Sequence, residues 1–179
     1  MLLKEICNVS LSEMAGRNPD GFDMSEQDWI FHKDGLKDSN VIHKIDSETD
    51  IRVKDTVFSL WKSNEIVCFV IFKLDKLPIS NSACYDLKFI GTDPVQNQKG
   101  FAFELMTTLF EISDYPILIG GAVSPKGEKL INKLIKAYTE IQGKKPKAIN
   151  TVFGDEVDFD KRFFRDSAVS LLFDSHDTV

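Results

Sequence analysis

The segment TDPVQNQKGFAFEL, from Thr92 to Leu105, holds residue types that suit the binding of a phosphate group. Asp93 and Pro94 turn the chain, and an amphipathic stretch begins near Gly100. The first N–H groups of a helix lack internal partners and lie at the positive end of its dipole, so an anion docks there readily. Gly100 would let the backbone approach a phosphate closely, and Lys99 adds a cation. The segment therefore predicts an anion site at the start of a helix.

An alternation of apolar runs and turn residues indicates the elements that must position this loop. An all-apolar run, IVCFVIF, is typical of a central strand that is covered on both faces. A hairpin around Ser63-Asn64-Glu65 and a helix capped by Ser25 with Asp28 follow from local chemistry. We expect strands at residues 2–7, 51–62, 66–74, 83–91, 117–123, 148–153 and 169–173, and helices at about 11–16, 26–34, 99–112 and 125–138. Residues 36–50 are polar and show no clear pattern, and the order of elements predicts an α+β fold around a central mixed sheet.

The loop resembles the CoA-binding motif of the GNAT (N-acetyltransferase) superfamily. That motif is a strand ending in Val-Asp-Pro or similar, then (Gln/Arg)-x-x-Gly-x-(Gly/Ala), then a helix with a Leu a few residues on. Here Thr92-Asp93-Pro94 stands in the first place, followed by Asn97-x-x-Gly100-x-Ala102 and Leu105. Asn97 replaces the Gln or Arg of the family and keeps a polar side chain.

A second stretch is similar to the family's Asn-x-x-(Ala/Gly)-x-x-Leu-Tyr pattern. It runs Ser124-x-x-Gly127-x-x-Leu130-Ile131, with Ser124 in place of Asn and Ile131 in place of Tyr. In many of these enzymes the Tyr protonates the departing CoA thiolate. The resemblance is best over residues 83–138, whereas residues 1–50 and 139–179 match only in broad plan.

The resemblance implies a fold and a cofactor. It implies one GNAT-like domain over residues 1–179, with acceptor-side helices and a loop in 1–50, a cofactor-binding core in 51–138 and C-terminal strands in 139–179. Its mostly antiparallel sheet, flanked by helices, would splay in a V between the fourth and fifth strands, with the pantetheine arm of acetyl-CoA, or another acyl-CoA, between them. The cofactor contacts it implies are Ile90, Thr92, Asn97, Gln98, Lys99, Gly100, Phe101, Ala102 and Ser124.

The implied activity is direct transfer of an acyl group to a primary amine of a small molecule or a protein. Such an enzyme needs a group that takes a proton from the amine and one that gives a proton to the thiolate. Asp86 is a candidate for the first role, because period two places it on one strand face with Lys88, Ile90 and Thr92; a solvent-facing Asp is the alternative. Tyr138 and Tyr115 are the nearest tyrosines for the second role, although Tyr138 also suits packing at a helix end.

Other interpretations of the same residues stay open. Ser124 could contact a cofactor or serve only as a helix N-cap, and Gly120-Gly121 could admit a ligand or form a bulge. Trp29, Phe31 and Trp61 could line an acceptor pocket or belong to the core.

The substitutions at Asn97 and Ile131 favour an alternative function: a catalytically inactive binding or inhibitory protein with the same fold. The acidic run from Asp155 to Asp160 would then be a partner-facing surface, or merely a solvated one. A further variant transfers an acyl or aminoacyl unit to a nucleic-acid base, and the net charge speaks against it.

The amino-acid composition narrows the classes of partner and site that we expect. The net charge of −6 and the absence of a long basic run disfavour a nucleic-acid partner. The sequence has three cysteines, an odd number, which leads us to expect reduced thiols. It has no secretion-type start and no apolar run of about 20 residues, so we expect a cytoplasmic protein without a membrane span. His32, His43 and His176 are scattered and no CxxC occurs, so we expect no metal site. A homodimer is compatible with all of this.

Overall fold

The computed structural model describes residues 25–96, 99–120, 125–158 and 168–174. Over these residues the strands are β1 (Asn40–Lys44), β2 (Thr49–Lys54), β3 (Val57–Lys62), β4 (Glu65–Lys76), β5 (Ala83–Thr92), β6 (Ile117–Gly120), β7 (Lys147–Asn150), β8 (Glu156–Val157) and β9 (Val169–Phe173). The helices are α3 (Glu26–Gly35), α4 (Phe101–Ile112) and α5 (Pro125–Gln142), with the short 3-10 helix η1 (Pro94–Gln96).

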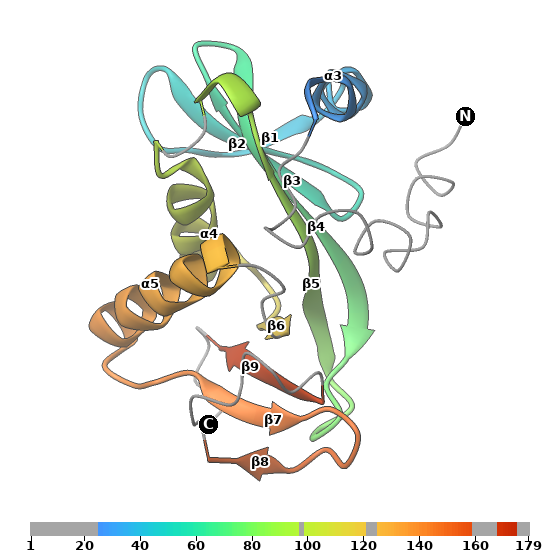
Figure 1. Cartoon of the computed structure of the whole chain (residues 1–179), viewed down its shortest axis with the longest axis vertical. Helices are drawn as coiled ribbons and strands as arrows, with labels where there is room; N and C mark the ends of the chain where they lie inside the picture. The colour runs from blue at the N-terminus through green and yellow to red at the C-terminus, as the bar shows by residue number, and fades with distance from the viewer. Residues whose placement is uncertain (1–24, 97–98, 121–124, 159–167, 175–179) are drawn as a thin grey trace.

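All nine strands of the described residues belong to one sheet, in the order β1-β2-β3-β4-β5-β6-β9-β7-β8. The pair β5–β6 is parallel and the other pairs are antiparallel. Figure 1 shows that the sheet extends along the long axis of the molecule. Helices α4 and α5 lie beside its middle, and α3 lies at the end that carries β1–β3. The predicted α+β class, with a mostly antiparallel sheet flanked by helices, is confirmed.

Strands β1–β5 form a meander in which each strand pairs with the one before it. Ser63 and Asn64, both with positive φ, make the tight turn between β3 and β4, as the sequence predicted. The single strand predicted at 51–62 is wrong, because Asp55, with a φ of 56°, turns the chain between β2 and β3. Residues 36–50, which showed no pattern, contain β1 and the start of β2. The predicted strand 2–7 and helix 11–16 lie outside the described residues.

The parallel pair β5–β6 is the place where the sheet opens. Its register contains two pairs, Tyr85 with Ile117 and Asp86 with Leu118. Beyond them β5 continues to Thr92, while β6 continues to Gly120 in pairing with β9. This divergence is the V-shaped splay predicted between the fourth and fifth strands, which in the structure are β5 and β6.

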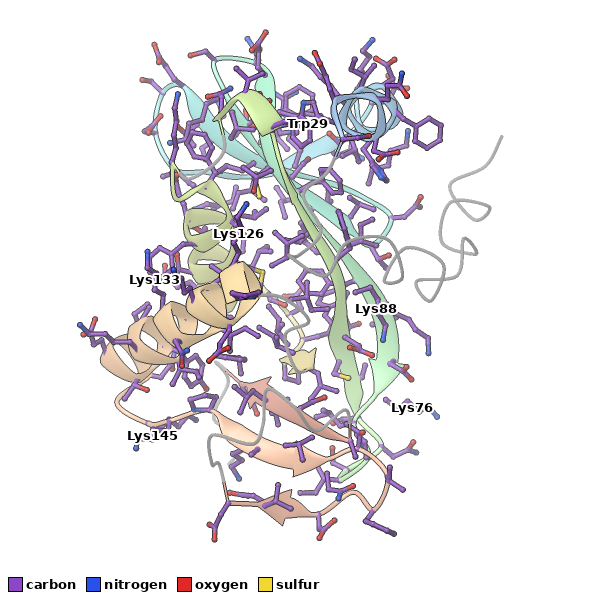
Figure 2. All side chains as sticks on the ribbon, viewed as in Figure 1. Trp29, Lys76, Lys88, Lys126, Lys133 and Lys145 are labelled. Atoms are coloured by element: carbon purple, nitrogen blue, oxygen red, sulfur yellow. The ribbon has the colours of Figure 1, made fainter. Side chains whose placement is uncertain are left out.

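Helix α3 covers one face of the meander. The hydroxyl of Ser25 accepts the N–H of Asp28 at 3.1 Å and caps the helix, as predicted. Trp29 is buried and stacks on Phe69 of β4, with ring centres 5.7 Å apart. Figure 2 shows Trp29 between α3 and the sheet. A separate apolar cluster therefore holds α3 to the sheet: Trp29, Leu36, Val57, Trp61, Ile66 and Phe69.

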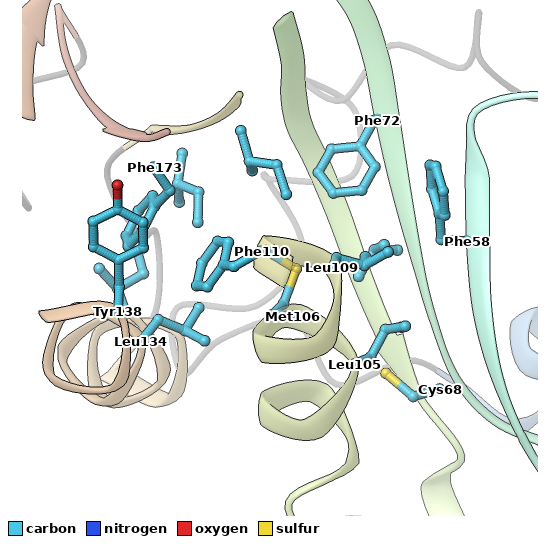
Figure 3. Close-up of a cluster of buried hydrophobic side chains, with 14 of the residues drawn as sticks. Phe58, Cys68, Phe72, Leu105, Met106, Leu109, Phe110, Leu134, Tyr138 and Phe173 are labelled. Atoms are coloured by element: carbon cyan, nitrogen blue, oxygen red, sulfur yellow. The ribbon is translucent and has the colours of Figure 1, made fainter. Parts of the chain in front are cut away.

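Helices α4 and α5 cover the opposite face with the main core, part of which Figure 3 shows. Cys68 and Val70 of β4 belong to this core, whereas Phe69 between them belongs to the α3 cluster, as strand alternation requires. Helix α5 turns inward a face of fully or nearly fully buried residues, namely Ile131, Leu134 and Tyr138. Leu130 and Ala137, which neighbour this face, are half-buried.

Within the described ranges, no helix combines the length and the apolar composition that crossing a bilayer requires.

Candidate functional site

Asp93 fixes the turn that follows β5. One oxygen of its carboxylate accepts the N–H of Val95 at 3.0 Å, and the other accepts the side-chain amide of Gln96 at 3.1 Å. The N–H of Asp93 donates to the carbonyl of Val67 in β4 at 3.1 Å. These bonds tie the loop to the sheet at the point where β5 ends, so the loop starts from a defined position.

Gly100 occupies the position before the first residue of α4. Its φ of 85° and ψ of 7° are left-handed, and a Cβ built on it would meet nothing within 4 Å. The requirement for glycine is therefore the backbone conformation, because L-residues adopt this region at a cost. No close approach of a described neighbour adds a second reason for glycine at this position.

Phe101 and Ala102, the first two residues of α4, both pack against the main core. Phe101 is 8% exposed and packs into the main core, and Ala102 is partly buried against the same core. Lys99, just before them, is exposed. The remaining predicted contacts of this loop and of the second motif lie outside the described residues: Asn97, Gln98 and Ser124.

Lys62 is a cation at the same helix start that sequence reasoning missed. It ends β3, and its ammonium lies 3.1 Å from the carboxylate of Glu104 and 5.1 Å from the centre of the Phe101 ring. Both side chains of the ion pair are about one-third exposed, at 34% and 33%. No local sequence pattern indicates this contact, because only the tertiary fold brings β3 and α4 together.

A bulge in β5 changes which residues share a face. Phe72 pairs with Leu87 and Ile71 pairs with Phe89, so Lys88 is the additional residue of the bulge. Before the bulge, Leu87 packs on the α4–α5 core; after it, Phe89 packs on the α3 cluster. The sequence carries no glycine or proline at this point that would have marked the shift.

The bulge makes the predicted face of β5 wrong. Ile90 packs against the α4–α5 core, and the hydroxyl of Thr92 donates to the sulfur of Cys68 in that core at 3.8 Å. Asp86 instead points to the other face, because its neighbour Tyr85 packs on the α4–α5 core. Asp86 and Thr92, expected on the same face of the strand, are therefore on opposite faces of the sheet.

Asp86 forms an ion pair with Lys88. The two side chains are 21% and 34% exposed, respectively, and Lys73 of β4 stands opposite Asp86 in the register. Figure 2 labels Lys88 on the side of the sheet away from α4 and α5. The carboxylate thus lies at the foot of the opening between β5 and β6, beside two lysines.

The contacts of Tyr138 are those of a buried packing residue. It is 2% exposed, packs edge-on against Phe110 and Phe173, and its hydroxyl exchanges hydrogen bonds with the backbone of Asp174. Those contacts support the packing role that the sequence left open, and the catalytic role stays a prediction without a supporting contact. Tyr115 is 37% exposed.

No protein-family model matches this chain, and no curated protein does. Several solved structures are similar to it, among them the following two. One is a ribosomal-protein-alanine N-acetyltransferase from Brucella melitensis biovar Abortus 2308, with 17% identity, a TM-score of 0.39, and coverage of 73% of this chain and 81% of that one. The other is Arabidopsis thaliana Naa50 in complex with the bisubstrate analogue CoA-Ac-MVNAL, with 10% identity, a TM-score of 0.36, and coverage of 84% of this chain and 93% of that one.

The aromatic residues proposed for an acceptor pocket divide between core and surface. Trp29 and Trp61 are 5% and 6% exposed and belong to the α3 cluster, whereas Phe31 is 53% exposed. His32, for which the sequence predicted no role, is half-buried over the ring of Phe69, with ring centres 4.8 Å apart. Trp29 and Trp61 thus belong to the core, and of the three only Phe31 is exposed enough for the acceptor-pocket role, which stays a prediction.

Thiol and metal chemistry find little support in the described residues. Burial raises the pKa of Cys68 to about 12 and that of Cys84 to about 11, so both stay protonated near neutral pH. Across the described ranges, His, Cys, Asp and Glu side chains form no group of three or more that could hold a metal ion.

Proposed function

We propose that this chain binds an acyl-CoA, most simply acetyl-CoA, and transfers the acyl group to a primary amine. One observation carries the proposal: β5 runs on past its last pair with β6 and leads, through the Asp93 turn, to a helix that starts at the left-handed Gly100. The opening suits an elongated arm that pairs with a strand edge. The helix start suits the phosphates at the end of that arm.

The residues around the opening fit such a ligand. The first N–H groups of α4, at Phe101 and Ala102, would hold the phosphates, and no Cβ at Gly100 obstructs them. Lys99 would supply positive charge at the same helix start, where the charge of Lys62 is shared with the carboxylate of Glu104. The backbone of β5 near Ile90 and Thr92 would pair with the amide groups of the arm. We retain Asn97, Gln98 and Ser124 as proposed contacts on the strength of the motif.

When bound, the cofactor supplies an activated acyl thioester. The chain must then orient an amine and take a proton from it. Asp86 is the proposed group from the sequence, and it lies on the face of β5 opposite α4. An acceptor amine, of a small molecule or a protein, would therefore approach from the α3 side while the phosphates stay on the α4 side.

Isothermal titration with acetyl-CoA tests the binding part of the proposal. We expect saturable binding by the wild type and loss of binding in Gly100→Glu, which sets a carboxylate at the phosphate position. Gly143→Glu is the matched control, because Gly143 also has a positive φ of 67° and open space around it but ends α5. No binding by the wild type at millimolar acetyl-CoA would reject the proposal; equal losses in both variants would reject the loop placement.

A non-catalytic binding protein is the second candidate, and Ile131 favours it. This residue stands where the family often has Tyr, and it is 6% exposed within the main core. The second candidate predicts that acetyl-CoA binds and that no primary amine causes release of the CoA thiol. Measured release with any amine would exclude it.

A further inference from the structure

His32 lies in the last turn of α3, among aromatic rings from three elements. Its ring centre is 4.8 Å from that of Phe69 in β4, 6.5 Å from that of Phe89 in β5 and 5.8 Å from that of Phe31. The imidazole is half-buried, so one part of it is enclosed by rings and another part faces solvent. It is therefore held in place and still accessible.

The position of Phe89 connects His32 to the opening of the sheet. Phe89 directly follows the bulge at Lys88, on the length of β5 that lies beyond its last pair with β6. His32 packs on that length from the face opposite α4. A ligand whose phosphates occupy the start of α4 and whose arm passes through the opening would present its acyl end on the opposite face of the sheet, which is the face where His32 lies.

The surroundings keep the imidazole uncharged near neutral pH. Burial lowers the pKa of His32 below its usual 6.5, and the negative charge of Asp28 on the same helix opposes this in part. β4 and β5 contact the ring through Phe69 and Phe89. The charged groups further along that face of the two strands are two ion pairs, Lys73 with Asp75 on β4 and Lys88 with Asp86 on β5. A neutral imidazole can accept a proton, whereas Asp86 is already paired with Lys88.

We propose that His32, rather than Asp86, takes the proton from the acceptor amine, an inference that rests on the proposed acyl transfer. The amine nitrogen bonds to the acyl carbon, and the C–S bond of the thioester breaks with its electron pair going to sulfur. The surplus proton on nitrogen passes to a ring nitrogen of His32, directly or through one water. The sulfur is protonated from solvent, and His32 then returns its proton to solvent.

A first experiment needs no acceptor. Proton–nitrogen NMR of ¹⁵N-histidine-labelled protein follows the imidazole signals, with His32→Gln assigning His32 and His43 on β1 serving as the internal reference. We expect the His32 signals to move on addition of acetyl-CoA at a concentration that titration shows to saturate the protein, while those of His43 stay. Unmoved His32 signals at saturation would overturn the inference and leave acyl-CoA binding intact; absent binding would overturn the proposed function itself.

A second experiment measures release of the CoA thiol from acetyl-CoA with a peptide bearing a free N-terminal amine, with lysine and with a simple diamine. We expect His32→Gln to lower kcat by roughly 10²-fold or more, to leave the KM for acetyl-CoA within about two-fold, and to abolish the acidic limb of the pH profile. His43→Gln should match the wild type. A His32→Gln enzyme that keeps its rate and pH profile, a loss confined to Asp86→Asn, or no release by a wild type that binds acetyl-CoA would each overturn the inference.

Discussion

The hydroxyl of Tyr138 donates to the backbone carbonyl of Asp174 at 2.5 Å and accepts the backbone N–H of the same residue at 3.0 Å. One side chain of α5 thus satisfies both backbone groups of the residue that follows β9. Tyr138→Phe should keep the ring packing but leave these groups without the hydroxyl. We expect a loss of about 1–3 kcal/mol in the free energy of unfolding, measured by urea denaturation.

The control for this variant is Tyr115→Phe, at a site 37% exposed, which should change stability by no more than about 0.5 kcal/mol. Acetyl-CoA affinity should be the same in both variants. If Tyr138→Phe kept full stability and lost turnover, the catalytic role predicted for Tyr138 would return.

Two glycines with the same backbone constraint should respond differently to alanine. Gly143 and Gly154 have φ values of 67° and 75°, so an alanine at either costs roughly 1–2 kcal/mol of conformational energy. A Cβ at Gly143 meets nothing within 4 Å, but at Gly154 it would lie 2.8 Å from the carbonyl oxygen of Pro78. Chemical denaturation should therefore show a larger loss for Gly154→Ala, and equal losses would contradict the packing of that turn on the β4–β5 loop.

The two buried thiols predict how stability changes in alkali. The pKa values of Cys68 and Cys84 are raised in the folded chain to about 12 and about 11, above the ordinary 9.0. Well below pH 9 both states keep these protons, so the thiols cause no pH dependence there. As the pH rises from about 9 through the folded values, the unfolded chain loses the protons more readily and the folded state loses stability.

A thiol reagent checks the same point at pH 8. In a Cys7→Ser background, we expect the two thiols to react only after denaturant is added. Rapid reaction of either thiol in the native protein would contradict its burial.

The burial of His32 predicts that folding stability depends on pH in the acidic range. Its pKa is lowered by burial, so as the pH falls below the usual 6.5 the unfolded chain takes up this proton before the folded chain does. Stability is therefore lost between that value and the lowered folded pKa, and the loss is complete below the latter. Urea unfolding at several pH values should show a shallower acidic decline in His32→Gln than in the wild type, with His43→Gln unchanged; parallel curves for all three would contradict a buried neutral imidazole.

Features governed by local chemistry could be predicted from the sequence. The hairpin at Ser63 and Asn64, the run IVCFVIF and the glycine before α4 each depend on a few neighbouring residues, and the structure has all three. β1 was missed because four of its five residues are exposed, which leaves no alternation to detect. The turn at Asp55 was missed because this Asp stands alone between Lys54 and Thr56, without a second turn residue such as the Ser63–Asn64 pair provides.

The candidate site was harder to predict, because its geometry depends on tertiary contacts. Lys62 reaches α4 only when β3 and α4 pack together, and the partner of Tyr138 lies in a distant strand end. The bulge at Lys88 reversed the predicted face of Ile90 and Thr92 relative to Asp86. The rule that alternate residues of a strand share a face fails after the one additional residue of a bulge. The residue type of Lys88 does not mark it as that residue.

The short parallel junction between β5 and β6 also separates two kinds of strand pairing. On one side the paired strands are close in sequence, and on the other side some of them are far apart. Strands β1–β5 each pair with their predecessor across a short turn, whereas β9 must return from the end of the described chain to lie between β6 and β7. Contacts that close short loops cost the least entropy and tend to form first. We therefore expect the five-stranded meander to assemble early, so the opening at β5 would be the boundary at which the late-folding half of the sheet is joined to the early one.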